Sequence, residues 1–144
     1  MSALEEWISQ SSLPRSLFEI IRMRASQING CAYCLDMHSK DALALGVPVD
    51  RLLLLDAWRE VPFYTDRERA ALEWTEALTL VTDGGVPDEV YDRVYPHFSE
   101  RELVELTWAV ATINLWNRVA ISMRTEPGHY RSRLRAEASD SLGS

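Results

Sequence analysis

Two cysteines and a histidine near residue 35 have a spacing that suits thiol chemistry. Cys31 and Cys34 are three residues apart, and His38 follows Cys34 by four residues. On an ideal helix all three fall within a stripe of about 60°, which they share with apolar residues such as Ala42. The spacing therefore predicts two thiols and an imidazole that are sheltered and can meet one another.

The two cysteines also stand at the expected start of a helix, directly after Asn29-Gly30. Unpaired N–H groups and the positive end of the helix dipole favour a thiolate there. A lowered thiol pKa makes a cysteine nucleophilic at neutral pH, and a nearby imidazole can relay the proton. The second thiol can then close a disulfide onto the oxidised first one. The segment thus holds each part of a two-cysteine redox cycle.

Cysteine and histidine at this spacing can also belong to other kinds of site. A c-type haem site needs a histidine directly after the second cysteine, and residue 35 is leucine, so that interpretation fails. A structural zinc site needs four ligands; the segment supplies three, and Glu19, His97 or His129 would have to complete it. Two buried free cysteines beside a core histidine remain an alternative. A thioredoxin-like fold is not supported, because no strand precedes the motif.

The sequence around this segment predicts helices. Glycine and proline are few, and no stretch alternates apolar and polar residues over the length of a strand. Two capping boxes, Thr65-x-x-Glu68 and Ser99-x-x-Glu102, mark helix starts. We expect one all-α domain over residues 1–124 and a polar, flexible tail over 125–144. The expected helices cover residues 13–27, 31–45, 51–60, 65–81 and 87–95, and a last one runs from 99 to at least 114 and at most 123.

Composition narrows the classes of partner. The chain has 144 residues with 22 acidic and 15 basic side chains, a net charge of −7. Nucleic acids and anionic membranes need a basic surface, so we expect neither as a partner. No secretory signal and no membrane-spanning run is visible, which predicts a cytoplasmic protein. We expect no metal and no cofactor.

The motif and its surroundings resemble the core of the AhpD-like alkylhydroperoxidase family, within the carboxymuconolactone decarboxylase superfamily. The resemblance extends over about residues 13–120, and its pattern of Glu-x11-Cys-x2-Cys-x3-His is quite specific. The segments that carry it are Glu19-Ile-Ile-Arg-Met-Arg-Ala-Ser-Gln-Ile-Asn-Gly-Cys-Ala-Tyr-Cys-Leu-Asp-Met-His-Ser-Lys-Asp-Ala42, Ala57-Trp-Arg-Glu60 and Ile113-Asn-Leu-Trp-Asn-Arg118.

The resemblance implies an all-helical homo-oligomer (a dimer, trimer or hexamer) that reduces alkyl hydroperoxides in antioxidant defence. It implies that Cys34 attacks the peroxide, that His38 and Glu19 form its proton relay, and that Cys31 is the more exposed resolving thiol. The implied reductant is a dithiol, carried by a lipoylated or thioredoxin-like protein. Some members carry a second histidine between the two cysteines, at the position of Tyr33.

Glu19 is placed differently by periodicity and by resemblance. On its own helix it lies opposite the apolar residues and close to Arg22, which is typical of a solvated carboxylate with an i,i+3 neighbour. The resemblance instead implies that this face meets the cysteine helix. We favour the second interpretation, because the spacing to Cys31 matches the family pattern.

The aromatic residues indicate less clearly where a substrate pocket lies. Trp58 and Trp116 stand at helical positions where aromatic residues are usually core or subunit interface. They could also wall a pocket, together with Tyr33, that suits an organic peroxide. Arg118 is expected to pair with a carboxylate or to orient a substrate.

Three other functions stay open. One is a general disulfide oxidoreductase or redox sensor whose electron acceptor is not a peroxide. Another is a decarboxylase of the lactone type, whose chemistry does not need a dithiol. The last is a non-catalytic scaffold with a vestigial site.

Overall fold

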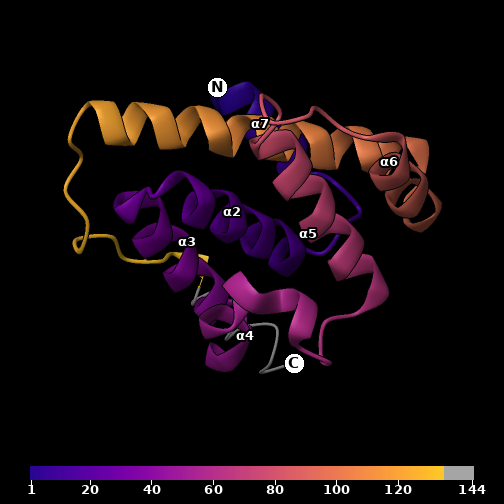
Figure 1. Cartoon of the computed structure of the whole chain (residues 1–144). Coiled ribbons are helices and arrows are strands. Elements are labelled where there is room, and N and C mark those ends of the chain that lie inside the picture. Colours follow the sequence, from indigo (N-terminus) through magenta and orange to yellow (C-terminus); the bar gives the residue numbers. More distant parts are fainter. Residues whose placement is uncertain (135–144) are drawn as a thin grey trace.

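The computed structural model describes residues 1–134 and is all-helical, as predicted; none of these residues lies in a strand. Figure 1 shows the long last helix lying across the bundle formed by the others. The α-helices are α1 (Ser2–Ser9), α2 (Arg15–Asn29), α3 (Ala32–Ala44), α4 (Val49–Leu53), α5 (Asp66–Thr79), α6 (Asp88–Val94) and α7 (Glu100–Ser122), and the 3-10 helices are η1 (Leu55–Glu60) and η2 (Tyr95–His97).

Helix α2 is the centre of the molecule, because α3, α5 and α7 all pack against it. Its side chains enter three apolar clusters. Leu17 and Ile21 contribute to the one shared with α5 and α7, Ile20 and Met23 to the one shared with the α3–η1 region, and Ala25 to a small one around the cysteines. Apolar packing on several sides leaves α2 without a broad solvated face. A polar residue on this helix must therefore find its partners inside the protein.

The α2–α3 turn places the cysteines at the start of α3. Gly30 takes the left-handed conformation, with φ of 70°, that ends α2, and the Cys31 N–H donates to the Ser26 carbonyl at 3.0 Å. Asn29 donates from Nδ2 to the Oδ1 atoms of Asn114 and Asn117 on α7, at 2.9 and 2.8 Å. These bonds tie the turn that opens α3 to the longest helix.

The helix boundaries agree with most of the sequence expectations. Both predicted capping boxes are present, at Thr65 for α5 and at Ser99 for α7. The single helix expected over 51–60 is wrong: the chain forms the short α4 and then η1, with a kink in which Ala57 has non-helical torsion angles. Helix α1 was not predicted; its buried residue is Ile8, which joins the cluster between α2 and α7.

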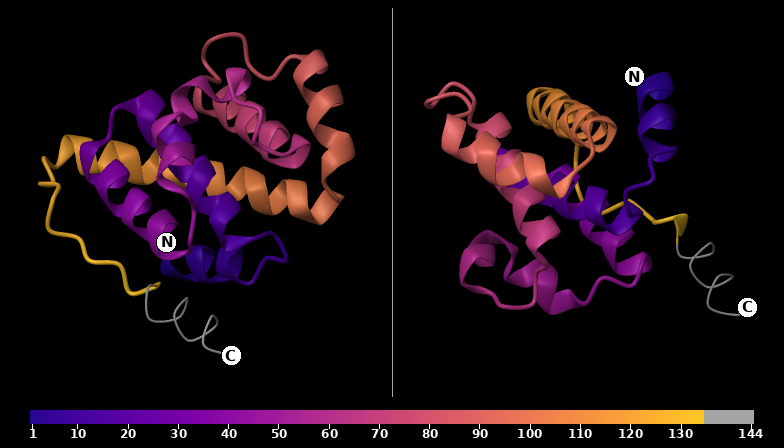
Figure 2. Two further views of the ribbon diagram at one scale, coloured as in Figure 1. Left: turned by 90° about the horizontal axis from the view of Figure 1, so that it is seen from below. Right: turned by 90° about the vertical axis from the view of Figure 1, so that its right-hand side faces the viewer.

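Residues 125–134, here called the C-terminal strap, return from the end of α7 to α3. Figures 1 and 2 show this yellow segment on the side of the molecule away from α6. Gly128 N–H donates to Asp36 at 3.0 Å, and Lys40 Nζ donates to the Tyr130 carbonyl at 3.0 Å. The part of the predicted flexible tail that the structure describes is thus bound to α3, whereas residues 135–144 lie outside the described residues. Within residues 1–134, no helix has the length and apolar character to cross a membrane.

The amide network between α2 and α7 generates a stability prediction. Asn117 is fully buried and donates from Nδ2 to Ser26 Oγ at 3.0 Å, while its Oδ1 accepts from Asn29. We expect Asn117→Ala to lower the free energy of unfolding by about 1–3 kcal/mol, because it leaves buried polar partners unsatisfied. Urea unfolding checks this, with the exposed Ser122→Ala on the same helix as control. Equal midpoints for the two variants would contradict the prediction.

Candidate redox active site

Cys31 and Cys34 are joined by a disulfide at the first turn of α3, with their Cα atoms 5.3 Å apart. Cys31 is the N-cap residue, and its sulfur accepts the Cys34 N–H at 3.3 Å. The thiols therefore sit among the unpaired N–H groups at a helix start, where the backbone favours negative charge.

Both sulfurs are buried. Cys31 is 1% exposed and Cys34 3%, and the two pack with Ala25, Ile113 and Ala120 beneath the half-buried Tyr33. Of the pair, Cys34 lines a cavity and Cys31 does not. The expectation that Cys31 is the more exposed thiol is therefore corrected, because its place at the N-cap turns it toward α7 rather than toward the surface.

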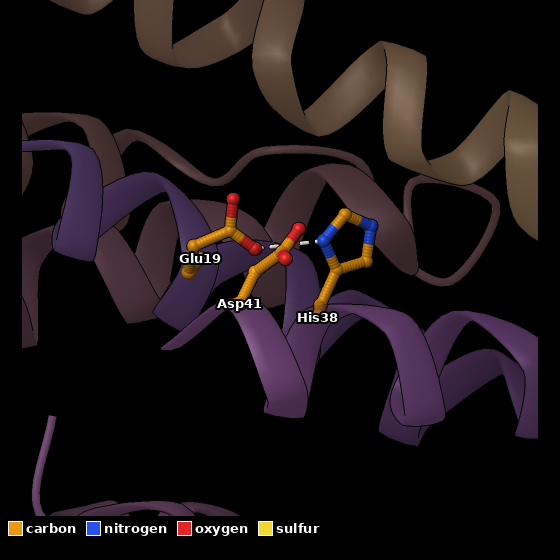
Figure 3. Close-up of side chains that lie close together, drawn as sticks. All are labelled: Glu19, His38 and Asp41. Carbon is orange, nitrogen blue, oxygen red and sulfur yellow. Dashed lines mark hydrogen bonds and ion pairs between the residues drawn. The ribbon is translucent and has the colours of Figure 1, made fainter. Parts of the chain in front are cut away.

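His38 and Glu19 meet across the α2–α3 interface. His38 Nδ1 lies 2.7 Å from Glu19 Oε2, and Arg22 Nη1 donates to Glu19 Oε1 at 2.8 Å. Figure 3 shows the imidazole with this nitrogen toward Glu19 and its second nitrogen turned away. Glu19 is 3% exposed. Helical periodicity alone therefore misplaced it, and the alternative from the resemblance, a contact with the cysteine helix, is present within one chain.

The pKa of Glu19 lies below its ordinary value of 4.5. Burial acts to raise it, but the hydrogen bond and charge of His38 and those of Arg22 together outweigh burial. Glu19 is thus an ionised acceptor in the interior, and its hydrogen bond orients the imidazole.

Asp41 is a neighbour of this pair that the sequence analysis missed. It is buried, and its carboxylate accepts the Tyr130 hydroxyl at 2.8 Å for Oδ1 and 3.1 Å for Oδ2. Glu19, His38 and Asp41 each place a ligand-type atom within 4.8 Å of the others. A signal was present, since Asp41 follows Cys34 and His38 by seven and three residues and so shares their helical face.

A cavity of about 1120 Å³ opens in front of Cys34. Its wall combines polar residues of α2, α3 and the strap with an apolar side that includes Phe18, Ile113 and Trp116. Tyr33 and Trp116 line it, as the sequence analysis proposed. Trp116 is half-exposed and donates from Nε1 to Glu5 Oε1 at 3.2 Å, so it stands at the rim toward α1.

Trp58 and Arg118 do not line this cavity, and their predicted pocket roles are corrected. Trp58 is buried beside Leu55 and Leu72 and donates from Nε1 to Glu76 at 2.8 Å. Arg118 lies on the exposed side of α7 and donates to the side chain and carbonyl of Asn114, not to a carboxylate. Trp58 thus supports the packing of η1 against α5, whereas the bonds of Arg118 lie within α7.

The acidic residues near His38 form a hydrogen-bonded network. Glu19 is already bonded by Arg22 and His38, and Asp41 by Tyr130, so a cation would have to displace these donors. The zinc alternative from the sequence needed free thiols, whereas the two sulfurs bind each other. His129 lines the cavity, while His97 belongs to η2. The donor set therefore suits proton transfer better than metal binding.

The depressed pKa of Glu19 predicts a pH-dependent contribution to stability. Its folded pKa is below 4.5, so its stabilising effect is complete above pH 4.5 and is lost as pH falls through the folded value. We expect Glu19→Gln to cost about 1.5–3 kcal/mol at pH 7, the range for hydrogen bonds to charged groups. The difference from wild type should shrink below pH 4.5 in a series of urea unfolding curves.

The control for this series is Glu6→Gln, which removes an exposed carboxylate on α1. It should differ from wild type by less than about 0.5 kcal/mol at every pH. A Glu19→Gln penalty that stays constant from pH 7 down to pH 3 would show that the ionised form of Glu19 is not what stabilises the fold.

Comparison with known proteins agrees with this architecture. The model of the carboxymuconolactone decarboxylase family matches residues 1–77. The uncharacterized protein YdfG of Bacillus subtilis is 45% identical over 123 residues, which cover 85% of this chain and 84% of that protein. A crystal structure from Agrobacterium tumefaciens, a protein of unknown function with a suggested assignment as the antioxidant defence protein AhpD, is 40% identical with a TM-score of 0.85 over 90% of this chain and 88% of that one.

A peroxidase-related protein from Silicibacter has the same fold, with a TM-score of 0.76 over 93% of this chain and 72% of that chain, at 23% identity. These matches and the all-helical architecture around the Cys31–Cys34 pair lead to one assignment. The chain belongs to the carboxymuconolactone decarboxylase family and has an AhpD-like core.

Proposed function

We propose that the protein is a thiol-dependent peroxidase that reduces alkyl hydroperoxides through the Cys31/Cys34 pair. The observation that supports this most is the position of Cys34, which lines a large cavity one helical turn from His38, while His38 is bonded to the buried, ionised Glu19. A nucleophile, a base and a group that orients the base are thereby assembled at one wall of a substrate-sized cavity.

The proposed cycle begins with the reduced pair. The Cys34 thiolate attacks the outer oxygen of the hydroperoxide, the O–O bond breaks, and the leaving alkoxide takes a proton to become the alcohol. Cys34 is then a sulfenic acid. Cys31 attacks its sulfur, water leaves, and the disulfide forms. An external dithiol returns two electrons and two protons and is itself oxidised to a disulfide.

The protons pass through His38 in this proposal. Its Nδ1 is held by Glu19, so the other ring nitrogen is the one available to the cavity (Figure 3). That nitrogen can take the Cys34 proton and return it to the leaving alkoxide, directly or through water. Glu19 stabilises the imidazolium in between. No second histidine is required, although Tyr33 occupies the place where some relatives have one.

Burial of the disulfide bears on the reductant. Both cysteine residues are less than 4% exposed, and of the two only Cys34 lines the cavity. A dithiol on a slim arm, such as a lipoyl group of a protein partner, can enter this cavity. A thioredoxin-like protein, whose cysteines lie on its own surface, would need Cys34 to become more accessible first. We therefore favour the lipoylated partner.

We also propose that the protein is a homo-oligomer located in the cytoplasm. Val104, Trp108, Leu115 and Val119 are exposed and follow one stripe of α7. Such a stripe is more typical of a subunit interface than of a solvated helix, which supports a homo-oligomer. A cytoplasmic location suits a dithiol that must be returned to the reduced state in each cycle.

The first test is a single turnover. Reduced protein mixed with an equimolar amount of tert-butyl hydroperoxide should lose two thiols and the mass of two hydrogen atoms within seconds, as the disulfide forms. Intact-mass spectrometry and thiol counting against time follow the reaction. Thiols that react no faster than a free thiol would contradict the peroxidase and leave the general disulfide oxidoreductase, or redox sensor, as the better explanation.

Two variants assign the thiols in that experiment. Cys34→Ser should abolish the peroxide reaction, whereas Cys31→Ser should stop at the sulfenic acid, which a dimedone adduct detects. If Cys31→Ser is inert and Cys34→Ser reacts, the roles of the two cysteines are the reverse of those proposed.

The cavity predicts a preference for organic peroxides. Trp116 adds an aromatic wall near the rim, so Trp116→Ala should lower the rate constant for cumene hydroperoxide by about tenfold, the cost of a lost aromatic contact of roughly 1.4 kcal/mol. The rate constant for hydrogen peroxide should change little. The control is Trp7→Ala, an exposed tryptophan of α1 outside the cavity. Equal losses with both peroxides would indicate a general effect on the fold instead of a substrate contact.

A further inference from the structure

We propose that Asp41 and Tyr130 are positioning residues of the proton relay: Tyr130 holds the Asp41 carboxylate beside the His38–Glu19 pair, where its charge stabilises the imidazolium. This inference rests on the proposed function for the identity of the proton donor, Cys34. It adds a second carboxylate to the relay, and it gives the C-terminal strap a part in the site.

The geometry of α3 supports this placement. Cys34, His38 and Asp41 follow one another at intervals of four and three residues, so they share one face of the helix. Asp41 is buried, and its carboxylate lies within 4.8 Å of ligand-type atoms of both Glu19 and His38. Figure 3 shows the Asp41 side chain beside the hydrogen bond that joins Glu19 to His38. A carboxylate at this distance acts on the imidazole through space without displacing Glu19 from Nδ1.

Two carboxylates, Glu19 and Asp41, lie beside His38. Arg22 on α2 pairs with Glu19 and also lies within 3.3 Å of Glu5. The other charged residues around the cavity are Glu6 of α1, Arg15 of α2, and His129, Arg131 and Arg133 of the strap. In this arrangement Asp41 adds a second negative charge beside the imidazolium that forms as Cys34 ionises.

Tyr130 keeps the Asp41 carboxylate in place. Its hydroxyl donates to both oxygens of the carboxylate, and its backbone carbonyl accepts from Lys40. Both the side chain and the backbone of Tyr130 are thus bound to α3. Burial, the hydrogen bond to Asp41 and the nearby negative charges of Asp41 and Glu19 all raise the pKa of Tyr130. The phenol thus remains a donor over the whole range in which histidine and cysteine titrate.

The test compares Asp41→Asn with Asp36→Asn. The first removes the charge beside His38 but keeps an oxygen that can accept from Tyr130. The second removes a carboxylate of the same helix that accepts from Gly128 of the strap and pairs with Lys40 of α3. Asp36 is not part of the His38 cluster. Two readouts are used: the NMR titration of the His38 ring protons, assigned with His38→Gln, and the rate of peroxide oxidation of the reduced pair.

We expect Asp41→Asn to lower the pH midpoint of the His38 titration by about one unit and to slow peroxide oxidation near pH 6.5 about tenfold, as loss of a nearby buried charge predicts. Tyr130→Phe, which keeps the charge but frees the carboxylate, should act in the same direction by a smaller factor. Asp36→Asn should match wild type in both readouts. Circular dichroism confirms that each variant is folded.

An unchanged His38 midpoint in Asp41→Asn would overturn the inference, because Asp41 would then serve only to anchor the strap. Equal shifts in Asp41→Asn and Asp36→Asn would also overturn it, since strap attachment in general would be the cause. The NMR titration uses no peroxide. A wild-type protein that fails to react with peroxide would therefore refute the proposed function but not this inference. The pH midpoints of the His38 titration would still decide whether Asp41 acts on His38.

Discussion

A buried carboxylate organises this molecule. Glu19 projects from the central helix α2, and its hydrogen bonds to Arg22 on the same helix and to His38 on α3 make an interior charge tolerable. An ionised group without such partners would destabilise the fold by several kcal/mol. The register between α2 and α3 is therefore set by the one arrangement that brings His38 to Glu19. Because His38 is one turn from Cys34, the same contact also sets where Cys34 lies.

The sequence predicted which residues of α3 form the candidate site better than it predicted the residues around them. The spacing of Cys31, Cys34 and His38 needs only helix geometry to be interpreted, and two capping boxes located the starts of α5 and α7. Periodicity failed for Glu19 because it assumes one buried and one solvated face. Helix α2 is packed by α3, α5 and α7, so the side opposite its apolar stripe is interior as well.

The remaining differences depend on tertiary contacts that local patterns do not encode. Composition predicts a flexible tail after residue 124, but the Tyr130 phenol meets the Asp41 carboxylate 89 residues away. Bonds from Gly128 to Asp36 and from Lys40 to the Tyr130 carbonyl also hold residues 128–130 against α3. The placement of Trp58 also depends on a residue distant in sequence. Its position on a helix is compatible with lining a pocket, but Glu76 on α5 accepts a hydrogen bond from its indole N–H and holds it in the core. In both cases the partner is distant in sequence, which is why these placements required the structure.

The first turn of α3 explains how a buried dithiol could cycle without remodelling the fold. Both sulfurs belong to the same turn, with Cα atoms 5.3 Å apart, within the ordinary range for a disulfide. Opening the bond would leave Cys31 at the N-cap and Cys34 facing the cavity, so neither helix needs to move. In the proposed cycle the barrier to reaction would then lie in access, because substrate and reductant would both enter by the cavity bounded by α1, α7 and the strap. These walls, more than the backbone around the cysteines, would determine which molecules reach Cys34.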